Sequence, residues 1–491
     1  MRIEFLKSKM NKIKWKIFNA IPKSFITFIL WLVAISISFL LYRFQRFRFS
    51  MVFSGIVILI VLVLFNPIQI SVGLIWIAQI FPMSFTISLG GINFRIIDIY
   101  MVIVILTWIT LYILPSDKIK IIFGWSEFFA TLFMIVFVIN IFRGLAFHYN
   151  QGTSAPTFRS DLVRGPIYYG TLFFFNKIIE LKDNIKIILI KHWFYAAIAS
   201  SIIYFIMAII KIYLGLSYSM WGFNIQLFVF VWGFSFTMGI FVNKRWWILS
   251  LLYFFLLFYI ASRTTLGGIF LIYFFIIIFW IIALPKGKKL KTITKIAAYS
   301  IGSFATVFIL FFLFFSSTQS TQAYSIISRN TVLLKPQYLQ FLPSLQWRFL
   351  ESLESIHFWK NSSLLFGTGW GKGFGTTMNS LGAVDVLYMT VLAKAGLLGL
   401  ISFLGMFAAF FINIWKLIKN FNLIESNFVK AFVINCAAII PTALIMGLTM
   451  SHLWFGSATI ITMVVFMAIS SKLWREIKQK KVPALELHEI Q

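Results

Sequence analysis

Charged residues are scarce in this chain, and acidic residues are the scarcest of them. Only 12% of the 491 residues are charged, whereas a soluble domain carries roughly a quarter. Asp and Glu together number 14, against 43 Lys and Arg, and 60% of the chain is hydrophobic. Apolar runs of about 20 residues recur, which is the length that a helix needs to cross a bilayer. The composition therefore excludes an ordinary soluble protein and predicts a polytopic helical membrane protein.

Cysteine is nearly absent, and a secretory signal is not expected. The one cysteine, Cys436, lies inside an apolar run, so neither a disulfide nor a cysteine metal site is expected. The basic N-terminal stretch is too long for a signal peptide, and no small-residue cleavage site follows it. Apolar residues instead recur at helical spacing over residues 2–22, with lysines between them. We expect residues 1–23 to form a basic amphipathic helix on the cytoplasmic face of the membrane.

The apolar runs predict an all-α transmembrane bundle of about 11–14 spans. They lie at about 24–41, 51–65, 68–89, 96–114, 121–142, 166–178, 186–212, 218–242, 246–262, 265–284, 293–315, 384–414, 427–449 and 452–471. The short runs at 51–65 and 166–178 are predicted to be half-helices or re-entrant segments, and Asn66-Pro67 breaks the pattern. The predicted organisation is a bundle over 24–315 with an external loop at 142–165, a large external loop at 316–384, three last spans over 385–471 and a basic cytoplasmic tail at 472–491.

The formal net charge of +29 would suggest nucleic acid as the partner of a soluble protein. Here most lysines lie in short loops between apolar runs, as the positive-inside rule expects, so no nucleic-acid partner is predicted. With the N-terminus inside, the basic loops all fall in the cytoplasm: 115–120, 180–186, 244–245, 285–291, 416–419 and 472–481. Arg43, Arg46 and Arg48 do not fit this topology, because they would face outward.

Arginine is the main cation of the segments that are predicted to face outward, where the insertion bias disfavours it. The loop at 142–165 has three arginines, Arg143, Arg159 and Arg164, and no lysine. Three more arginines follow in later outward segments: Arg263, Arg329 and Arg348. A guanidinium group binds phosphate oxygens in a bidentate way. We interpret these arginines as functional candidates. The structural alternative is pairing with lipid headgroups, or with Asp161 and Glu351.

Two of these arginines lie in recognisable local patterns. Arg263 is held by a tight turn at 261–268 between two apolar runs, and a snorkelling arginine would use the same place. Residues 343–359 predict an amphipathic helix on the surface of the bundle or of the membrane, with an apolar stripe (Leu345, Phe349, Leu353, Ile356) beside a polar one (Arg348, Glu351, Ser352, Ser355). Arg348 and Glu351 form either a wet ion pair or, if their stripe faces a cavity, a cation and a carboxylate for a ligand.

Five glycines alternate over residues 367–375, in a spacing that matches neither a Walker loop nor a dinucleotide fingerprint. The run permits close backbone approach to a ligand, with Gly369 and Gly371 as candidates and Lys372 as a phosphate contact, or it is merely a flexible turn. Asp385 follows at the mouth of the next apolar run, either at the water line or paired with an arginine.

The order of these motifs resembles the O-antigen polymerase and O-antigen ligase superfamily of polytopic glycosyltransferases. The matching features are Ser262-Arg263 opening a run, an arginine-bearing helix at 348–359, a GxGxG turn at 367–371, and a small-Gly-Leu-Leu-Gly kink at 395–399 that follows Asp385. The resemblance covers roughly residues 254–404, and only the hydropathy profile agrees upstream.

The resemblance implies a GT-C-like fold in the bacterial cytoplasmic (inner) membrane, with both termini cytoplasmic. It implies metal-independent transfer of a glycan from an undecaprenyl-pyrophosphate donor to a sugar hydroxyl of a lipid-linked repeat unit at the outer leaflet, without a cofactor. Arg263 and Arg348 would hold the donor pyrophosphate, with support from Arg143, Arg159 or Arg164. Ligases of the superfamily usually carry a histidine where this chain has Asp385, so the resemblance favours a polymerase. A chain-length regulator and a flippase are possible partners.

The mechanism also needs a base for the acceptor hydroxyl, and Asp385, Glu351 or Glu354 is available. No Asp-x-Asp motif occurs in the external loops, which fits chemistry without a metal. Two readings of other classes stay open: a flippase for lipid-linked oligosaccharides, and an assembly partner with no chemistry. A flippase would show internal repeats and cations within its spans, whereas here no repeat is seen and the basic residues cluster at loop ends.

Overall fold

The computed structural model describes residues 66–80, 86–89, 92–113, 124–151, 166–213, 225–260, 263–285, 294, 343–370, 386–448 and 456–488. The chain divides into two compact units, 1–66 with 86–94, and 67–85 with 95–491. The first unit contains the hairpin of β1 (Thr86–Leu89) and β2 (Ile92–Arg95), except for the last residue of β2. Everything else below concerns the second unit, whose described elements are all helical.

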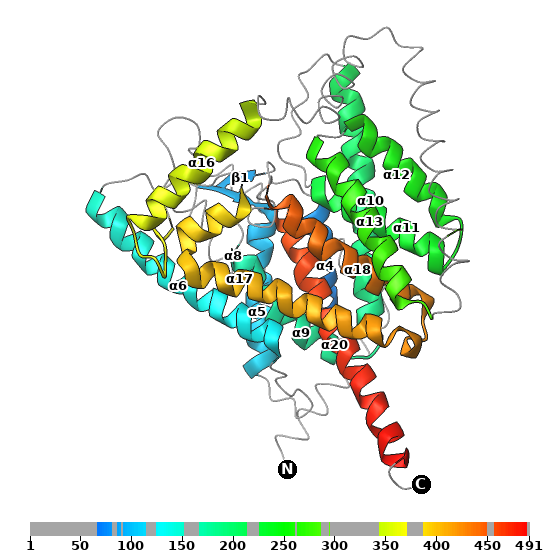
Figure 1. Ribbon diagram of the computed structural model, residues 1–491. Coiled ribbons are helices and arrows are strands. Elements are labelled where there is room, and N and C mark those ends of the chain that lie inside the picture. Colours follow the sequence, from blue (N-terminus) through cyan, green and yellow to red (C-terminus); the bar gives the residue numbers. More distant parts are fainter. Residues whose placement is uncertain are drawn as a thin grey trace, which may run out of the picture. The chain divides into compact units, whose positions relative to one another are not determined.

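The helices of the second unit follow the apolar runs of the sequence (Figure 1). They are α4 (Pro67–Ile80), α5 (Ile96–Ile113), α6 (Trp125–Gln151), α8 (Pro166–Tyr169), α9 (Thr171–Glu180), α10 (Ile185–Tyr213), α11 (Ile225–Phe241), α12 (Trp246–Ile260), α13 (Arg263–Ala283), α16 (Pro343–Lys360), α17 (Leu387–Lys419), α18 (Asn427–Met446) and α20 (Ser457–His488), with a 3₁₀ turn at Phe421–Leu423. Three of them begin at a proline (Pro67, Pro166 and Pro343), which lacks the N–H that a first helical turn leaves unpaired.

Five helical segments are long and apolar enough to cross a membrane: Trp125–Gly144, Ile185–Tyr204, Leu387–Lys419, Asn427–Met446 and Ser457–Gln479. Four shorter apolar segments accompany them: Pro67–Ile80, Ile96–Ile109, Leu227–Phe241 and Gly267–Ala283. Several apolar helices thus indicate a multi-pass membrane protein. The predicted total of about 11–14 spans stays a prediction, because residues 1–65 and 295–342, with the expected spans 24–41, 51–65 and 293–315, lie almost wholly outside the described residues.

Two predicted spans differ from the observed helices. The run at 68–89 is a helix only as far as Ile80, and its last residues belong to the hairpin. The run at 166–178 becomes α8 and the ten-residue α9, which rises about 15 Å and is too short to cross hydrocarbon, as the short run predicted. The predicted all-α class is confirmed for the bundle. The β1–β2 hairpin was not predicted.

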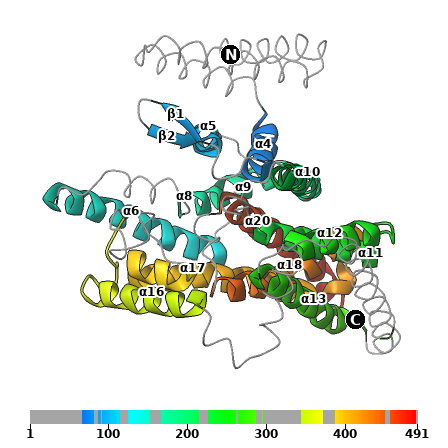
Figure 2. The same cartoon turned by 90° about the horizontal axis from the view of Figure 1, so that it is seen from above.

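Helix α20 is the central element of the bundle. It contacts α4, α8, α9, α10, α11 and α17, and Figure 2 shows it between α9 and α18. An aromatic cluster holds it to α10 and α11. The indole N–H of Trp193 donates to the hydroxyl of Thr462 at 2.9 Å, and its ring packs edge-on against Phe466 and Phe234 at centroid distances of 4.7 and 5.6 Å. The central helix is thus fixed by ring contacts and by one polar bond.

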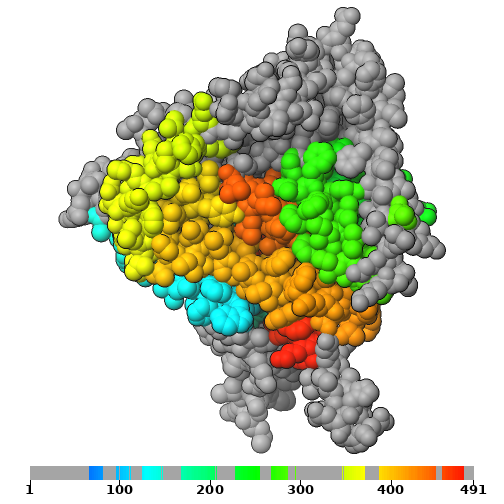
Figure 3. All heavy atoms as spheres, in the orientation of Figure 1, coloured from blue at the N-terminus to red at the C-terminus, as the bar shows by residue number. Residues whose placement is uncertain are grey.

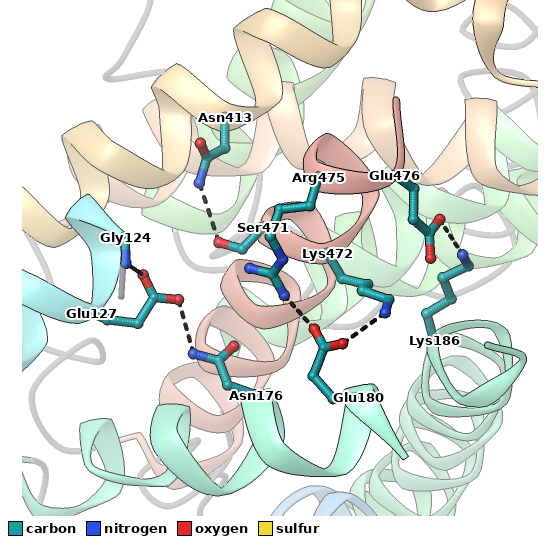
Figure 4. A network of polar contacts seen from close by, with 10 residues as sticks. All are labelled: Gly124, Glu127, Asn176, Glu180, Lys186, Asn413, Ser471, Lys472, Arg475 and Glu476. Carbon is teal, nitrogen blue, oxygen red and sulfur yellow. Dashed lines mark hydrogen bonds and ion pairs between the residues drawn. The ribbon is translucent and has the colours of Figure 1, made fainter. Parts of the chain in front are cut away.

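Ion pairs tie α20 to α9 and α10 at one end of the bundle (Figure 4). The carboxylate of Glu180 accepts hydrogen bonds from Lys472 at 2.8 Å and from Arg475 at 2.5 Å. Lys186, at the start of α10, pairs with Glu476. Burial alone would raise the pKa of Glu180, but its bonds to the two cations outweigh burial and lower the pKa below its ordinary value.

The starts and ends of other helices meet at the same place. The carboxylate of Glu127, buried in the first turn of α6, accepts hydrogen bonds from the Gly124 N–H at 3.0 Å and from the Asn176 side chain at 2.9 Å. The ammonium group of Lys416 on α17 lies 5.4 Å from the ring centre of Trp474 on α20. We call this the basic end of the bundle. It gathers segments predicted to share the cytoplasmic side (180–186, 416–419 and 472–481), and which side of the membrane it faces stays a prediction.

The Glu180 cluster yields a prediction for stability against pH. The Glu180→Gln variant should unfold more easily at pH 7 by about 1–3 kcal/mol, because two half-buried cations lose their anion. A lowered pKa means that the carboxylate stabilises the fold above the ordinary Glu value of about 4.5 and stops doing so as the pH falls through the lower folded value. Thermal unfolding followed by tryptophan fluorescence should therefore show a gap between wild type and variant that closes on acidification.

The matched control is Asp183→Asn, which removes an exposed carboxylate three residues from Glu180 and should change stability little at any pH. A gap for Glu180→Gln that is as large at pH 3 as at pH 7 would contradict the role given to its charge.

Candidate functional site

The bundle end opposite the basic end is built around a break in α17. Gly396 has φ 68° and ψ −167°, so the helix stops at residue 395 and restarts at residue 397 in another direction. A Cβ atom at this position would lie 2.3 Å from the Leu365 carbonyl oxygen and 2.5 Å from the Gly367 nitrogen. Only glycine permits both the positive φ and this close approach. The kink expected in the run at 395–399 is therefore confirmed at Gly396.

The turn that follows α16, residues 363–370, repairs the break on one side. A helix start leaves backbone N–H groups without partners. The N–H groups of Leu397 and Leu398 donate instead to the carbonyl oxygens of Leu364 and Leu365, at 3.0 and 3.1 Å. The restarted helix is thus capped by backbone from a different part of the chain.

The same turn repairs the other side of the break. The carbonyl oxygens of Ala393 and Lys394, which end the first segment, accept hydrogen bonds from the N–H groups of Thr368 and Gly369 at 2.8 and 3.1 Å. Gly367 and Gly369 both have positive φ, at 69° and 82°. The close backbone approach predicted for this glycine run therefore occurs, and the described partner is the broken helix itself.

The turn also docks on α6. The buried indole of Trp370 donates to the carbonyl oxygen of Phe137 at 2.9 Å, and its backbone N–H donates to that of Asn140 at 3.3 Å. Figure 2 shows α17 lying between α6 and α16. We call this assembly, residues 137–144 of α6, the turn 363–370 and residues 387–398 of α17, the kink end. It lies about 30 Å from the basic end, since roughly 20 helical residues of α17 separate them.

Arg143, predicted to bind substrate, lies at the centre of the kink end. Its Nη2 donates to the carbonyl oxygen of Gly367 at 2.9 Å, and its guanidinium group lies 6.0 Å from the ring centre of Phe366. Its Nε is buried and has no hydrogen-bond partner among the described residues. One arm of the guanidinium therefore fixes the turn, while Nε keeps an unused donor.

Helix α16 turns its polar stripe toward the protein. Glu351 and Ser355 are buried, at 8% and 1% exposure, and Arg348 is half-buried. The two serine hydroxyls at 352 and 355 bond to carbonyl oxygens of their own helix. Phe358, one of the residues flanking this stripe, packs against Ala393 of α17. The sequence left open whether this polar stripe faces water or the interior. In the structure it does not lie on a wet surface, because Glu351 and Ser355 are buried.

The start of α13, which carries Arg263, belongs to the same end of the bundle. A Cβ atom at Gly268 would lie 2.6 Å from the sulfur of Met446, in the last turn of α18. The residue after α18, Gly447, accepts a hydrogen bond at its carbonyl oxygen from the Leu387 N–H, 2.9 Å away at the start of α17. Arg263 is the first residue of α13, five positions before Gly268. Its side chain lies outside the described atoms.

Several candidates fall outside the described residues, so their places stay predictions. They are Arg159, Arg164, Gly371, Lys372 and Asp385. Of the catalytic candidates, the side chains of Arg348 and Glu351 are described. Within the described part of the chain, no group of three His, Cys, Asp or Glu side chains comes close enough to hold a metal ion.

Two buried polar residues at the kink end were missed in the sequence. Lys394, two residues before the break, has a fully buried side chain, and so does Asn140 of α6. Neither amide atom of Asn140 has a hydrogen-bond partner among the described residues. The signal for Lys394 was present, because a cation inside an apolar run is costly and marks a functional position. Lys394 is an exception to the clustering of basic residues at loop ends.

A third missed residue is Asp98 near the start of α5. Its carboxylate accepts a hydrogen bond at 2.6 Å from the hydroxyl of the buried Tyr168 on α8. Both residues lie close to segments predicted to face outward, since α8 follows the loop at 142–165. Asp98 is therefore a further carboxylate to weigh beside Glu351 and Asp385.

The break predicts a sharp cost for a side chain at Gly396. Gly396→Ala should destabilise the protein by roughly 1–3 kcal/mol or more, because strained φ alone costs that much and the Leu365 carbonyl must also move. Gly267→Ala is the control: nothing lies within 4 Å of its would-be Cβ, and alanine favours a helix by up to about 1 kcal/mol. Thermal unfolding in detergent compares them, and equal melting temperatures would contradict the role of the break.

The unpartnered amide of Asn140 gives a second prediction. Asn140→Leu should leave stability unchanged or raise it by about 1–3 kcal/mol, because a buried polar group without a partner is removed and an apolar side chain of similar size replaces it. Urea or thermal unfolding measures this. A clear loss of stability would show that the amide is satisfied in the folded protein and is not held ready for a ligand.

A search against protein-family models and a search of curated proteins each found no match.

Proposed function

We propose that this protein is a membrane-embedded glycosyltransferase of the surface-polysaccharide polymerase type. It takes a glycan from an undecaprenyl-pyrophosphate donor and transfers it to the terminal sugar hydroxyl of a lipid-linked repeat unit, at the outer leaflet and without a metal. The kink end is the site. The motifs that suggested this activity in the sequence are Arg263, Arg348, the glycine turn and the kink, and they lie between residues 263 and 399.

One observation carries the proposal: the turn 363–370 joins the arginine-bearing helix α16 to the broken helix α17 and to Arg143 of α6. Backbone hydrogen bonds fix the turn on α17, and Arg143 fixes it on α6. The turn thereby ties two arginine-bearing helices, α6 and α16, to α17. The start of α13, with Arg263, reaches the same end through the contact of Gly268 with Met446. That end lies opposite the lysine-rich one, as a site for anions at the outer leaflet requires.

The chemistry of glycosyl transfer from a pyrophosphate makes fixed cations valuable. Negative charge builds up on the leaving diphosphate as the sugar departs, and preorganised donors aimed at it lower the barrier. Arginine offers a rigid fork for phosphate oxygens. The Nε of Arg143 and the amide of Asn140 are buried donors with no partner among the described residues, and they lie one helical turn apart on α6. Lys394 adds a buried amino group at the same end.

The acceptor hydroxyl needs a group to receive its proton. Glu351 is the described carboxylate closest to this role, because it lies on the inward stripe of α16 and is 8% exposed. Asp385, just before α17, is the alternative that the sequence motif favours.

A second candidate function is supported by a specific observation. Broken helices and buried cations within spans are typical of transporters, where half-helix ends line a substrate site. The break at Gly396 and the buried Lys394 fit that description, so a flippase for lipid-linked oligosaccharides is the rival. The two activities differ in one respect: a transferase needs no membrane barrier, whereas a flippase has no measurable activity without one.

The decisive experiment uses purified protein in detergent with lipid-linked repeat units extracted from the host. We expect a ladder of polymer on a gel, which transport cannot produce in micelles. Repeat units left unchanged, together with their translocation by the same protein in liposomes, would instead establish the flippase.

Arginine variants test the site itself. Arg263→Ala and Arg348→Ala should each lower polymer formation by roughly 100- to 1,000-fold with normal protein levels, as loss of one transition-state donor does. Asn140→Leu should lower activity while stability is kept. Arg245→Ala is the matched control, since Arg245 is exposed in the loop between α11 and α12 near the basic end. Full-length polymer from Arg263→Ala or Arg348→Ala would count against the site.

A further inference from the structure

Helix α16 buries and exposes the opposite faces from an ordinary surface helix. A helix on a wet surface buries its apolar stripe and exposes its polar one. Here Glu351 and Ser355 are buried, whereas Phe349, Leu350 and Leu353 are 64%, 52% and 48% exposed. These three apolar side chains therefore face away from the protein, on a side of α16 that also exposes Gln346, His357 and Lys360, whereas Phe358 packs against Ala393. Exposing such an apolar face to water is unfavourable, so lipid or protein is expected to cover it.

The exposed face of α16 continues onto the turn after it. Leu364 and Leu365 are 53% and 54% exposed. The indole N–H of Trp359 donates to the Leu364 carbonyl oxygen at 2.9 Å, which ties the last turn of α16 to these leucines. Figure 3 shows α16 and the residues after it as one continuous surface beside the start of α17.

The same surface continues onto a candidate membrane span. Leu364 and Leu365 are hydrogen-bonded to Leu397 and Leu398, the first residues of α17 after its break. From there the exposed apolar residues of α17 recur at helical spacing: Leu397, Ile401 and Leu404. This segment, residues 397–419, is apolar and about 35 Å long, enough to cross a bilayer. Its exposed face is one that lipid chains cover.

We propose that α16 is an interfacial helix whose apolar face, Phe349, Leu350, Leu353, Leu364 and Leu365, lies in the lipid of the leaflet at the kink end. Lipid that covers Ile401 and Leu397 meets Leu364 and Leu365 next, and then α16. The end of the helix fits an interface too, because Trp359 and Lys360 are residue types enriched there. The helix thus presents Glu351 and Ser355 to the bundle and Phe349, Leu350 and Leu353 to the bilayer.

The proposal concerns the position of α16 and is independent of the transferase activity. A second copy of the chain is the other possible occupant, and continuity argues against it. A dimer contact would cover a patch bounded by a polar rim, whereas this patch merges with the side of α17.

Spin-label accessibility in lipid nanodiscs tests the proposal. Cysteines replace Phe349, Leu353 and Leu364 one at a time, and Glu354 serves as the control because it is exposed and polar on the same helix. Cys436 is fully buried, and labelling of the parent protein measures its background. We expect collision with oxygen, which concentrates in lipid, to exceed collision with a water-soluble nickel chelate at positions 349, 353 and 364, and the reverse at 354.

Each other outcome overturns the proposal. Nickel-dominated collisions at 349 and 353 would place the face in water. Labels shielded from both reagents would indicate a protein cover, and dipolar broadening between labels would identify a second copy. Because the three positions lie on an exposed face, their variants should fold, and elution as a single species in size-exclusion chromatography checks this. The measurement needs no substrate, so its failure leaves the transferase proposal untouched.

Discussion

The exchange of backbone hydrogen bonds between the turn 363–370 and the break in α17 is the constraint on which the kink end depends. Inside or near hydrocarbon, each unpaired N–H or carbonyl costs several kcal/mol, so a helix interrupted there must find new partners. Four such groups of α17 are satisfied by four of the turn. The break and the turn therefore stabilise each other, and neither is expected to persist alone. Because the turn also carries Trp370 and receives Arg143, the position of α6 follows from the same exchange.

The two ends of the bundle use charge differently. At the basic end, lysines and arginines are paired with scarce carboxylates such as Glu180 and Glu476, so the charge serves to hold helices together. At the kink end, Arg143 is bonded to a carbonyl oxygen, which leaves its positive charge without a bonded anion among the described side chains. A cation that is ordered by neutral partners keeps its field for an incoming anion. This contrast distinguishes a structural use of charge from one suited to binding.

Much of the fold was predictable, because hydropathy is a local property. The spans at 96–114, 186–212 and 427–449 correspond closely to α5, α10 and α18, and Pro67 begins a helix where the sequence indicated a break. The kink at Gly396 was predicted because small residues and glycine surround it. The orientation of α16 was left open because both of its stripes were plain in the sequence, and only long-range packing on α17 decides which one is buried. Asn140 gave no signal, since its isolation depends on residues that approach from another part of the chain.

The amphiphilic substrate of the proposed transferase would give the inverted α16 a purpose. The polyprenyl diphosphate sugar of the proposed reaction has an apolar tail that stays in lipid and a charged head that would have to reach the cations of the kink end. A helix lying at the interface with lipid on one side and Arg348 and Glu351 on the other separates the same two environments over its width of about 10 Å. Its backbone continues directly into the turn that holds Arg143 and the broken helix. A tail moving along the apolar face would therefore bring its diphosphate toward the kink end without leaving the bilayer.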